Sequence, residues 1–531
     1  MVAGQQVTWS APLRTAAVKR QGAGLIAMRD GAATEQVCIM TTQSGKPANC
    51  DLLVIGSGIS GLSAAVSAAA AGARVLVLER SVREEFGGNT RWTESYFRMK
   101  SDTEVSDDFE ERLISNAGYN LDPNIIREVS GEYATWPSFV KAHGMPDPEL
   151  ISTLSEQAGP TVQWLKGFGV RFDTLPTYFV TAAAPRLMPI GGGLAMIEAL
   201  LAHAQKIGVE FRYETTATKM ERGLDQVFGV TVTGPDGRQE VLRATNVMIA
   251  SGGFEGNPEM LTQYLGNSAR FVRPVARGGY YNRGEGIRMA LDAGAAPAGD
   301  FGSYHAEPLD PRSGATEALV MNFTYGVLIN KRGKRFLDEA PGPVDVHYDH
   351  ISRDIGEQPD GIAYVVFDQS INDVPNWKKS IRTDQPAIQA DTLQQLAEAC
   401  GLPAAPFLRT IQDYNAACPR GGAFKPLEAD GLATQGLDIN KSNWSRPIER
   451  GPFCAYPIIP GICFTYGGVK TNKQAQVIDQ DGRPIAGLYA AGEAAGLYYQ
   501  VYTGATSVMR GAVFGKIAGE HAAAALRARA R

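Results

Sequence analysis

Three glycines in the spacing GxGxxG separate two apolar segments in the run 52-LLVIGSGISGLSAAVSAAAAGARVLVLER-80. The first segment is short and apolar on both faces, as a buried parallel strand must be. The alanine-rich run that follows predicts a helix ending near Gly72, and 74-RVLVLE predicts a second strand that ends on an acid. A strand, a tight turn, a helix and a second strand in this order predict an α/β fold around a parallel sheet.

Each glycine of this turn has a physical role in holding a dinucleotide. Gly56 permits the tight turn, Gly58 lets the backbone approach a pyrophosphate, and Gly61 permits close packing of the helix on the strand. The free N–H groups and the dipole at the helix start favour the anionic pyrophosphate. Glu79, at the end of the second strand, can accept hydrogen bonds from ribose hydroxyls. Together these features predict a dinucleotide site rather than an ordinary glycine turn.

Two further segments favour FAD over NAD as the dinucleotide. Gly87-Gly88-Asn89-Thr90 follows the second strand, and 489-YAAGEAAG places Glu493 beside Gly492. We expect this glycine–acid pair to hold the ribityl chain, and the last helix, beginning near Ser507, to point its N–H groups at the flavin pyrimidine. The predicted FAD contacts are Gly56, Ser57, Gly58, Ser60, Gly61, Glu79, Arg80, Gly88, Asn89, Thr90, Ala217, Ala250, Gly252, Gly492, Glu493, Ser507 and Val508.

The nucleotide domain is predicted to be split in the sequence. Residues 1–49 show no periodicity and no secretory signal, so we expect a poorly ordered extension without a role in the fold. Residues 50–302 form the first part of the FAD-binding domain and include a helical segment at 100–185. Residues 303–463 form an inserted domain that covers the substrate, and residues 464–531 return to complete the FAD-binding domain.

Composition excludes several classes of function. The net charge of −5 gives no attraction to nucleic acid or to an anionic membrane. No apolar run reaches the roughly 18 residues that a membrane span needs, so the chain is not expected to be an integral membrane protein. The 6 cysteines form no CxxC pair, which predicts no iron–sulfur cluster, no metal site and no disulfide framework. Scattered reduced thiols predict a cytoplasmic protein.

A family resemblance rests on motifs spread over residues 50–531. They are GSGISG, GGNT, 250-ASGGF, 284-GEGIRMALDAGA, 327-VLINKRGKRFLDE, 465-TYGG, 487-GLYAAGE and 511-GAVFGKIAG. The chain resembles the flavoprotein superfamily of FAD-dependent fumarate reductase and 3-ketosteroid dehydrogenase, and 82-VREEFGGNTRWTESYFRM resembles its tricarballylate dehydrogenase-like members. The resemblance implies a GR2-type Rossmann-like FAD-binding domain with an inserted, mobile α+β capping domain. It also implies an oxidoreductase acting on CH–CH groups. Because no histidine precedes Lys141, we expect noncovalent FAD.

The same resemblance implies a set of site residues. The first active-site histidine of fumarate reductase corresponds to His305, the second to Phe464, and its carboxylate-binding arginine to Tyr502. Pro343 stands where its proton-donating arginine would be. In 3-ketosteroid dehydrogenase a tyrosine lies at the position of Tyr502. The predicted catalytic residues are Tyr502 with His347 or Tyr348, and the predicted substrate-binding residues are His305, Thr465, Tyr466 and Thr506.

Tyrosine in place of arginine favours a neutral substrate, because a phenol donates to a developing enolate without needing an anion. We therefore predict dehydrogenation or reduction of a Cα–Cβ bond beside a carbonyl, on a cyclic ketone or ketosteroid-like small molecule. Reoxidation would need an external acceptor: a quinone, oxygen or a separate electron-transfer protein. One alternative is a tricarballylate dehydrogenase or fumarate-reductase-like enzyme that draws cations from Arg91, Arg98 or Arg510. Another alternative is an electron-transfer flavoprotein subunit without its own substrate.

Overall fold

The computed structural model describes residues 49–116, 122–128, 131–142, 145, 147–174, 186–224 and 226–529. These residues belong to one compact unit, Pro47–Arg531. The predicted extension 1–49 lies outside the described residues except for Asn49, and so does the end of the predicted helical segment, at 175–185. Among the described residues, no helix is both long and apolar enough to span a bilayer.

A largely parallel sheet carries the predicted nucleotide turn. Its strands run in the order β17-β18-β8-β1-β2-β5, with β6 and β7 forming an antiparallel extension on β8. The strand β1 is parallel to both β2 and β8, and β8 is parallel to β18. The bounds are β1 (Cys50–Ile55), β2 (Val75–Leu78), β5 (Glu210–Arg212), β6 (Thr216–Arg222), β7 (Val227–Thr233), β8 (Gln239–Ile249), β17 (Gln476–Ile478) and β18 (Pro484–Ala490). The α/β prediction is confirmed, and β18 joins the sheet from the far end of the chain.

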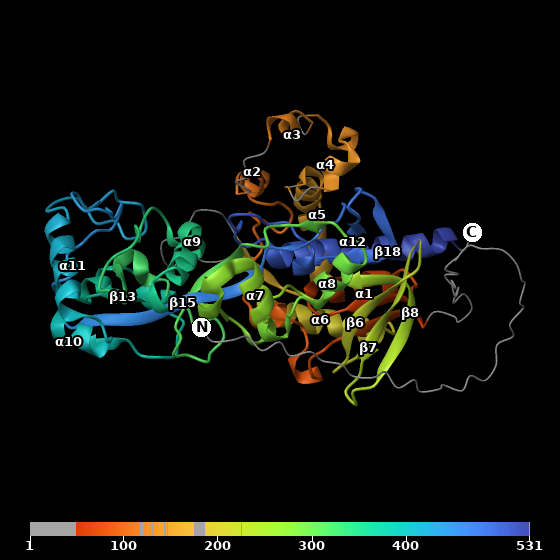
Figure 1. Cartoon of the computed structure of the whole chain (residues 1–531), viewed down its shortest axis with the longest axis horizontal. Helices are drawn as coiled ribbons and strands as arrows, with labels where there is room; N and C mark the ends of the chain where they lie inside the picture. Colours follow the sequence, from red (N-terminus) through yellow and green to blue (C-terminus); the bar gives the residue numbers. More distant parts are fainter. Residues whose placement is uncertain are drawn as a thin grey trace, which may run out of the picture. The chain divides into compact units, whose positions relative to one another are not determined.

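Helices α1 (Ile59–Ala70), α6 (Gly192–Lys206) and α12 (Ser507–Arg529) pack beside this sheet. Figure 1 shows α12 lying along α1. Glycines make this close approach possible, because a Cβ at Gly515 would lie 2.3 Å from the carbonyl oxygen of Ser60. The last helix therefore begins next to the start of the first one, where the nucleotide turn lies.

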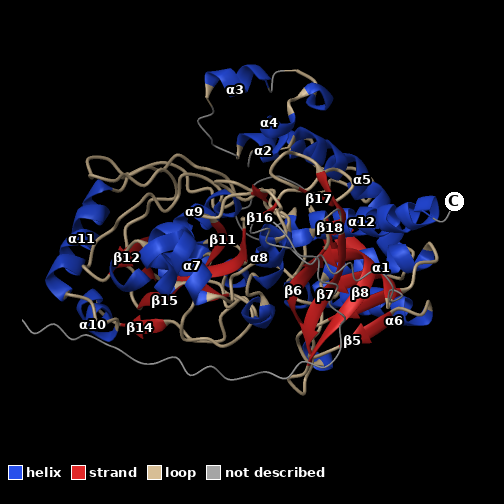
Figure 2. Cartoon of the chain, turned by 45° about the vertical axis from the view of Figure 1, so that its right-hand side comes forward, coloured by secondary structure: helices blue, strands red, loops and turns tan. Residues whose placement is uncertain are grey.

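A second sheet is built around the long strand β15 (Phe453–Thr465). Its order is β11-β15-β13-β12, and β9 and β14 also pair with β15. The helices α9 (Val344–Gly356), α10 (Leu393–Ala399) and α11 (Ala404–Ala417) accompany it, and Figure 2 shows α10 and α11 near β12, β14 and β15. The other strands are β9 (Arg273–Pro274), β11 (Tyr304–Leu309), β12 (Val327–Asn330), β13 (Ala363–Phe367) and β14 (Ile388–Ala390).

Alternation along β13 shows that this second sheet is buried on both faces. Val365 and Phe367 belong to a core shared with α9, whereas Tyr364 and Val366 belong to a core shared with α10 and α11. The sheet covers most of the predicted capping segment, although β9 precedes residue 303 and β15 runs past residue 463. The division into domains stays a prediction.

The predicted helical segment holds α2 (Phe109–Ser115), α3 (Pro123–Glu128), α4 (Ser138–Ala142) and α5 (Pro148–Lys166). Asp147 caps α5 by accepting from the N–H groups of Glu149 and Leu150. Its carboxylate also accepts from the hydroxyl of Tyr133 at 2.5 Å and lies 3.9 Å from the ammonium of Lys470. The remaining elements are β3 (Phe172–Thr174), β4 (Leu187–Pro189), α7 (Pro258–Leu265), α8 (Glu285–Asp292), β10 (Pro297–Ala298) and β16 (Gly468–Val469).

Candidate active site

A cavity of about 500 Å³ runs between the two sheets. Loops at the carboxyl ends of β1, β2 and β8 line one part, which we call the nucleotide end. Residues of β11, α9 and the end of β15 line the other part, which we call the β11 end. The carboxyl ends of parallel strands are where α/β sheets bind ligands, so this position suits a cofactor with a substrate beside it.

The glycine turn leaves room for an anion in front of α1. A Cβ at Gly56 would lie 2.4 Å from the carbonyl oxygen of Ala250, and a Cβ at Gly61 would lie 2.0 Å from that of Gly56. A Cβ at Gly58, by contrast, would meet nothing nearer than 3.8 Å. Gly58 is also the N-cap of α1 and lines the cavity. The turn is thus tight on its inner side and open toward the cavity, which fits a pyrophosphate at a helix N-terminus.

Glu79 and Arg80 stand at the end of β2. The Glu79 carboxylate accepts from the N–H and hydroxyl of Ser57 and, at 2.8 Å, from the N–H of Ser81. A carboxylate can accept about four hydrogen bonds, so one position is left for a ribose hydroxyl. Arg80 pairs with Glu285 at 2.9 Å, which fixes it at the cavity edge.

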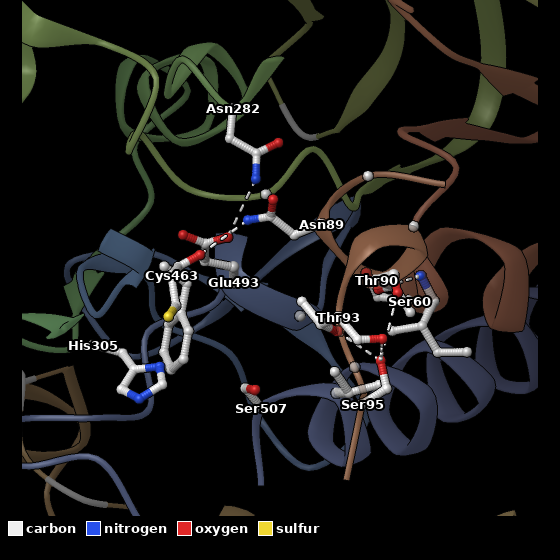
Figure 3. A pocket seen from close by; sticks show the side chains of 18 of the residues that line it. Ser60, Asn89, Thr90, Thr93, Ser95, Asn282, His305, Cys463, Glu493 and Ser507 are labelled. Atoms are coloured by element: carbon white, nitrogen blue, oxygen red, sulfur yellow. Dashed lines mark hydrogen bonds between the residues drawn. The ribbon is translucent and has the colours of Figure 1, made fainter. Parts of the chain in front are cut away.

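A buried amide–carboxyl network lies between Asn89 and Glu493. Asn89 and Asn282 both donate to Oε1 of Glu255, at 2.6 and 2.7 Å, and Asn282 also donates to Glu493 at 3.4 Å. Asn89 also donates to the carbonyl oxygen of Cys463 at 3.0 Å, and Figure 3 shows the Asn282 amide directed toward Glu493. Burial, reinforced by Glu493, raises the pKa of Glu255 well above its usual range.

Two cavity-lining acceptors in this part of the cavity are buried without a partner: Oδ1 of Asn89 and the hydroxyl oxygen of Ser251. A cofactor in the cavity would satisfy them. Together with the open space before Gly58, these unpaired atoms indicate that the residues present fit FAD.

The loop before α12 closes the cavity with aromatic rings. The Tyr502 hydroxyl accepts from the N–H groups of Thr506 and Ser507, each at 3.1 Å, and donates to Oγ of Ser507. Its ring lies 4.4 Å from that of His305 and 5.0 Å from that of Phe464, measured between centroids. Tyr502 therefore forms a wall of the β11 end while its hydroxyl caps the start of α12.

His305 and Tyr348 form a neutral hydrogen-bonded pair at the β11 end. The Tyr348 hydroxyl lies 2.7 Å from Nε2 of His305, which is 6% exposed. Burial, with smaller contributions from Arg353 and Arg186, lowers the pKa of His305 to about 3. Burial also raises the pKa of the Tyr348 phenol well above its usual range. At neutral pH the pair is an imidazole and a phenol, so it can pass a proton without first burying a charge.

Charged side chains that were not predicted from the sequence line the same end. Arg186 lies 3.4 Å from Asp345, and Arg382 pairs with Glu94 at 2.8 Å and with Glu317 at 3.4 Å. Removal from solvent raises the pKa of Glu317 to about 8. The basic run 378-KKSIR was a usable signal for Arg382, whereas no local pattern marks Arg186.

Most predicted site residues are brought together around this cavity. Those that line it are Gly56, Ser57, Gly58, Ser60, Glu79, Arg80, Gly88, Asn89, Thr90, Ala217, Ala250, Gly252, Gly492, Glu493, Ser507, Val508, His305, Tyr348 and Tyr502. Of the cations named for a carboxylate substrate, Arg510 lines the cavity, and it stacks 4.4 Å from the ring of Tyr498. Arg98 instead pairs with Asp108 at 2.7 Å.

Five predicted residues do not line the cavity, and each has a different neighbour. Gly61 lies behind the turn, against Gly56. The other four point elsewhere: Thr465 bonds to Glu493, Tyr466 to Asp349 and Thr506 to Tyr498, and the ring of His347 lies 5.3 Å from that of His350. Their predicted roles in contacting substrate or cofactor have no support from this geometry.

Comparison with known proteins gives one family and several relatives. Residues 51–508 match the family model described as FAD binding domain. Vinyl phenol reductase of Lactiplantibacillus plantarum is 27% identical over 490 residues, covering 85% of this chain and 91% of that protein. NADH:fumarate oxidoreductase of Klebsiella pneumoniae is 27% identical over 90% of this chain, which spans 48% of that longer protein. The 3-oxosteroid 1-dehydrogenase of Mycolicibacterium smegmatis is 29% identical over 57% of each chain.

Among solved structures, the open conformation of a flavocytochrome c3 fumarate reductase has the same fold. Its TM-score is 0.68 at 24% identity, covering 90% of this chain and 78% of that one. The split α/β sheet with a second sheet packed against it is therefore a known architecture.

Proposed function

Because this chain belongs to the FAD-binding-domain family, we propose that it dehydrogenates, or in reverse reduces, a Cα–Cβ bond beside a carbonyl group. It is an FAD-dependent oxidoreductase of the group that contains fumarate reductases and 3-oxosteroid dehydrogenases. FAD supplies the two-electron acceptor or donor for the hydride. The chain's own residues bind the cofactor, exclude water and move the accompanying proton.

The observation that carries the proposal is the neutral pair of His305 and Tyr348 at the β11 end of the cavity. In the reducing direction Tyr348 donates its phenolic proton to the carbon α to the carbonyl. In the oxidising direction it takes the proton from that carbon as its own phenolic proton passes to Nε2 of His305. His305 orients the phenol through the 2.7 Å contact at Nε2. The Tyr502 hydroxyl could donate to a substrate carbonyl only by giving up its hydrogen bond to Ser507. We therefore assign the proton transfer to Tyr348, and Tyr502 forms part of the cavity wall.

The substrate proposed from this wall is a small neutral carbonyl compound such as a cyclic ketone. The rings of His305, Phe464 and Tyr502 form an apolar face against which a flat molecule can pack. A second candidate is a carboxylate, favoured by Arg186, Arg382 and Lys379 along the same cavity. Because the cavity extends past the nucleotide loops to a distinct β11 end, it supports an enzyme with its own substrate over an electron-transfer subunit.

Reoxidation is proposed to use an external acceptor, whether a quinone, oxygen or a separate electron-transfer protein. A cytoplasmic location and noncovalent attachment of the cofactor stay predictions.

The proposal is tested by mixing the oxidised holoenzyme anaerobically with saturated cyclic ketones, 3-ketosteroids and tricarballylate and following loss of the flavin absorbance. Tyr348→Phe should lower the rate about 10²- to 10⁴-fold, the usual contribution of a general acid or base, with FAD binding unchanged. Tyr489→Phe is the matched control, because Tyr489 also bonds a histidine, His521 at 2.9 Å, but lies outside the cavity. An unchanged rate in Tyr348→Phe would remove the proton role from that residue.

A further inference from the structure

Three side chains with metal-ligating atoms converge at the β11 end of the cavity: His305 and Glu307 from β11, and Cys463 from β15. A ring nitrogen, a carboxylate oxygen and the sulfur all lie within 4.8 Å of one another. All three residues line the cavity. Figure 3 shows the sulfur of Cys463 on the side of the His305 ring. Imidazole, thiolate and carboxylate together are ligands that suit zinc-class cations.

A β-bulge brings the cysteine to the same side as the other two ligands. Opposite β11, His305 pairs with Phe464, but the next residue, Ala306, pairs with Ile462. Cys463 is therefore the extra residue on β15 and has no partner across the ladder. His305 and Glu307 are two residues apart on their strand and so share a face. Bulges commonly re-aim a side chain beside a functional site, and this one directs a thiol toward a histidine and a carboxyl group.

Two of the three ligands carry buried atoms without a partner. Nδ1 of His305 and Oε2 of Glu307 have no hydrogen bond in the structure, and the His305 side chain is 6% exposed. Leaving such a buried polar atom unpaired costs free energy, which a ligand between the two atoms would recover. The other ring nitrogen of His305 is already held by the Tyr348 hydroxyl. If Nε2–H donates to Tyr348, Nδ1 presents its lone pair, which is how metal-binding histidines are usually oriented.

The distances require only a small contraction. Zinc bonds of about 2.0 Å to nitrogen or oxygen and about 2.3 Å to sulfur place tetrahedral ligand atoms roughly 3.3–3.6 Å apart. Side-chain rotation of Glu307 and Cys463 can supply a shift of about 1 Å without moving either strand. Three protein ligands leave a fourth position, and all three residues line the cavity.

We propose that His305, Glu307 and Cys463 form a three-ligand site for a zinc-class divalent cation, with its open position facing the cavity. Binding forms a metal–sulfur bond and releases the thiol proton to solvent, with no change in oxidation state. The open position can take a carbonyl oxygen of the substrate and polarise it in place of an arginine. That last role rests on the proposed function, whereas metal binding itself does not.

The experiment uses the full-length, FAD-loaded enzyme and no substrate. The protein is treated with a chelator, loaded with Zn²⁺, dialysed and analysed for zinc, and the zinc environment is read by X-ray absorption. We expect one zinc per chain with one sulfur neighbour at about 2.3 Å. In Cys463→Ser the sulfur neighbour should disappear. Cys454→Ser is the matched control, because Cys454 is buried on the same strand but outside the cluster, and it should keep the wild-type signal.

Two results would overturn the site: no zinc retained by the wild type, or an unchanged sulfur signal in Cys463→Ser. If Cys463→Ser does not hold FAD, Glu307→Gln decides, because losing a carboxylate ligand should weaken zinc binding at least tenfold. Unchanged affinity in Glu307→Gln would refute the proposal. Failure of the flavin-bleaching assay would leave this result untouched, so the two proposals fail separately.

Discussion

Gly58→Ala should separate cofactor binding from folding at the nucleotide turn. The added Cβ would meet nothing nearer than the carbonyl oxygen of Gly87 at 3.8 Å, and Gly58 has φ of −66°, which any residue adopts. A Gly→Ala change at such a position alters the free energy of unfolding by less than about 1 kcal/mol. The same methyl would stand in the space where the backbone is expected to meet the pyrophosphate. Overpacking of this kind costs about 1–3 kcal/mol, or about 5- to 150-fold in the Kd for FAD.

The assay is a titration of the apoprotein with FAD, followed by flavin fluorescence, beside thermal unfolding of the apoprotein. Gly61→Ala is the contrasting variant, because its Cβ would lie 2.0 Å from the carbonyl oxygen of Gly56 and should lower stability as well as binding. Gly421→Ala is the neutral control, since it is exposed and a Cβ there meets nothing within 4 Å. If Gly58→Ala changed the Kd less than twofold while remaining folded, the pyrophosphate would not approach this glycine.

Two further predictions concern stability. Asp147→Ala removes both the cap of α5 and the carboxylate beside Lys470, so it should lower the free energy of unfolding, measured in urea, by about 3 kcal/mol. Asp147→Asn keeps a capping oxygen and should lower the free energy of unfolding clearly less. Equal decreases in the two variants would contradict the capping role. Burial lowers the pKa of Lys441 to about 8, from 10.5 in the unfolded chain. Between pH 8 and 10.5 the unfolded state therefore keeps the Lys441 proton while the folded state loses it, so stability rises with pH. Over this range the free energy of unfolding of wild type should rise by up to about 3 kcal/mol relative to that of Lys441→Met. A pH-independent difference in urea unfolding between the two proteins would refute the assignment.

The nucleotide end could be predicted from the sequence because its determinants are local. Gly56, Gly58, Gly61 and Glu79 lie within one strand–helix–strand unit, and the roles of such glycines follow from backbone sterics alone. The return of Gly492 and Glu493 to the same cavity was predictable for a different reason: β18 is an apolar strand that needs a place in a parallel sheet.

The β11 end could not be read from the sequence in the same way, because its contacts are set by pairing between distant strands. Cys463 faces the cavity through a bulge opposite His305, and no feature of the sequence near either residue encodes that register. His347 and Tyr348 are neighbours in α9 and so point in different directions from the helix. Which of the two faces the cavity depends on how α9 packs against β11 and β15, and no local sequence pattern encodes that packing.

Arginines missing at particular positions favour a neutral substrate, but the cavity also contains arginines from other parts of the chain. The resemblance puts Tyr502 and Pro343 where cations were expected, but Arg186, just before β4, and Arg382, in a loop beyond β13, both line the same cavity. A comparison made position by position cannot detect a charge supplied by another element. Arg382 is balanced by Glu94, however, and Arg186 by Asp345, so each cation is offset by a nearby carboxylate. A dianion or trianion would have to displace those carboxylates, which costs several kcal/mol for each buried pair broken. A single carbonyl or carboxylate needs no such displacement, and this difference in charge is what the bleaching assay across ketones and tricarballylate measures.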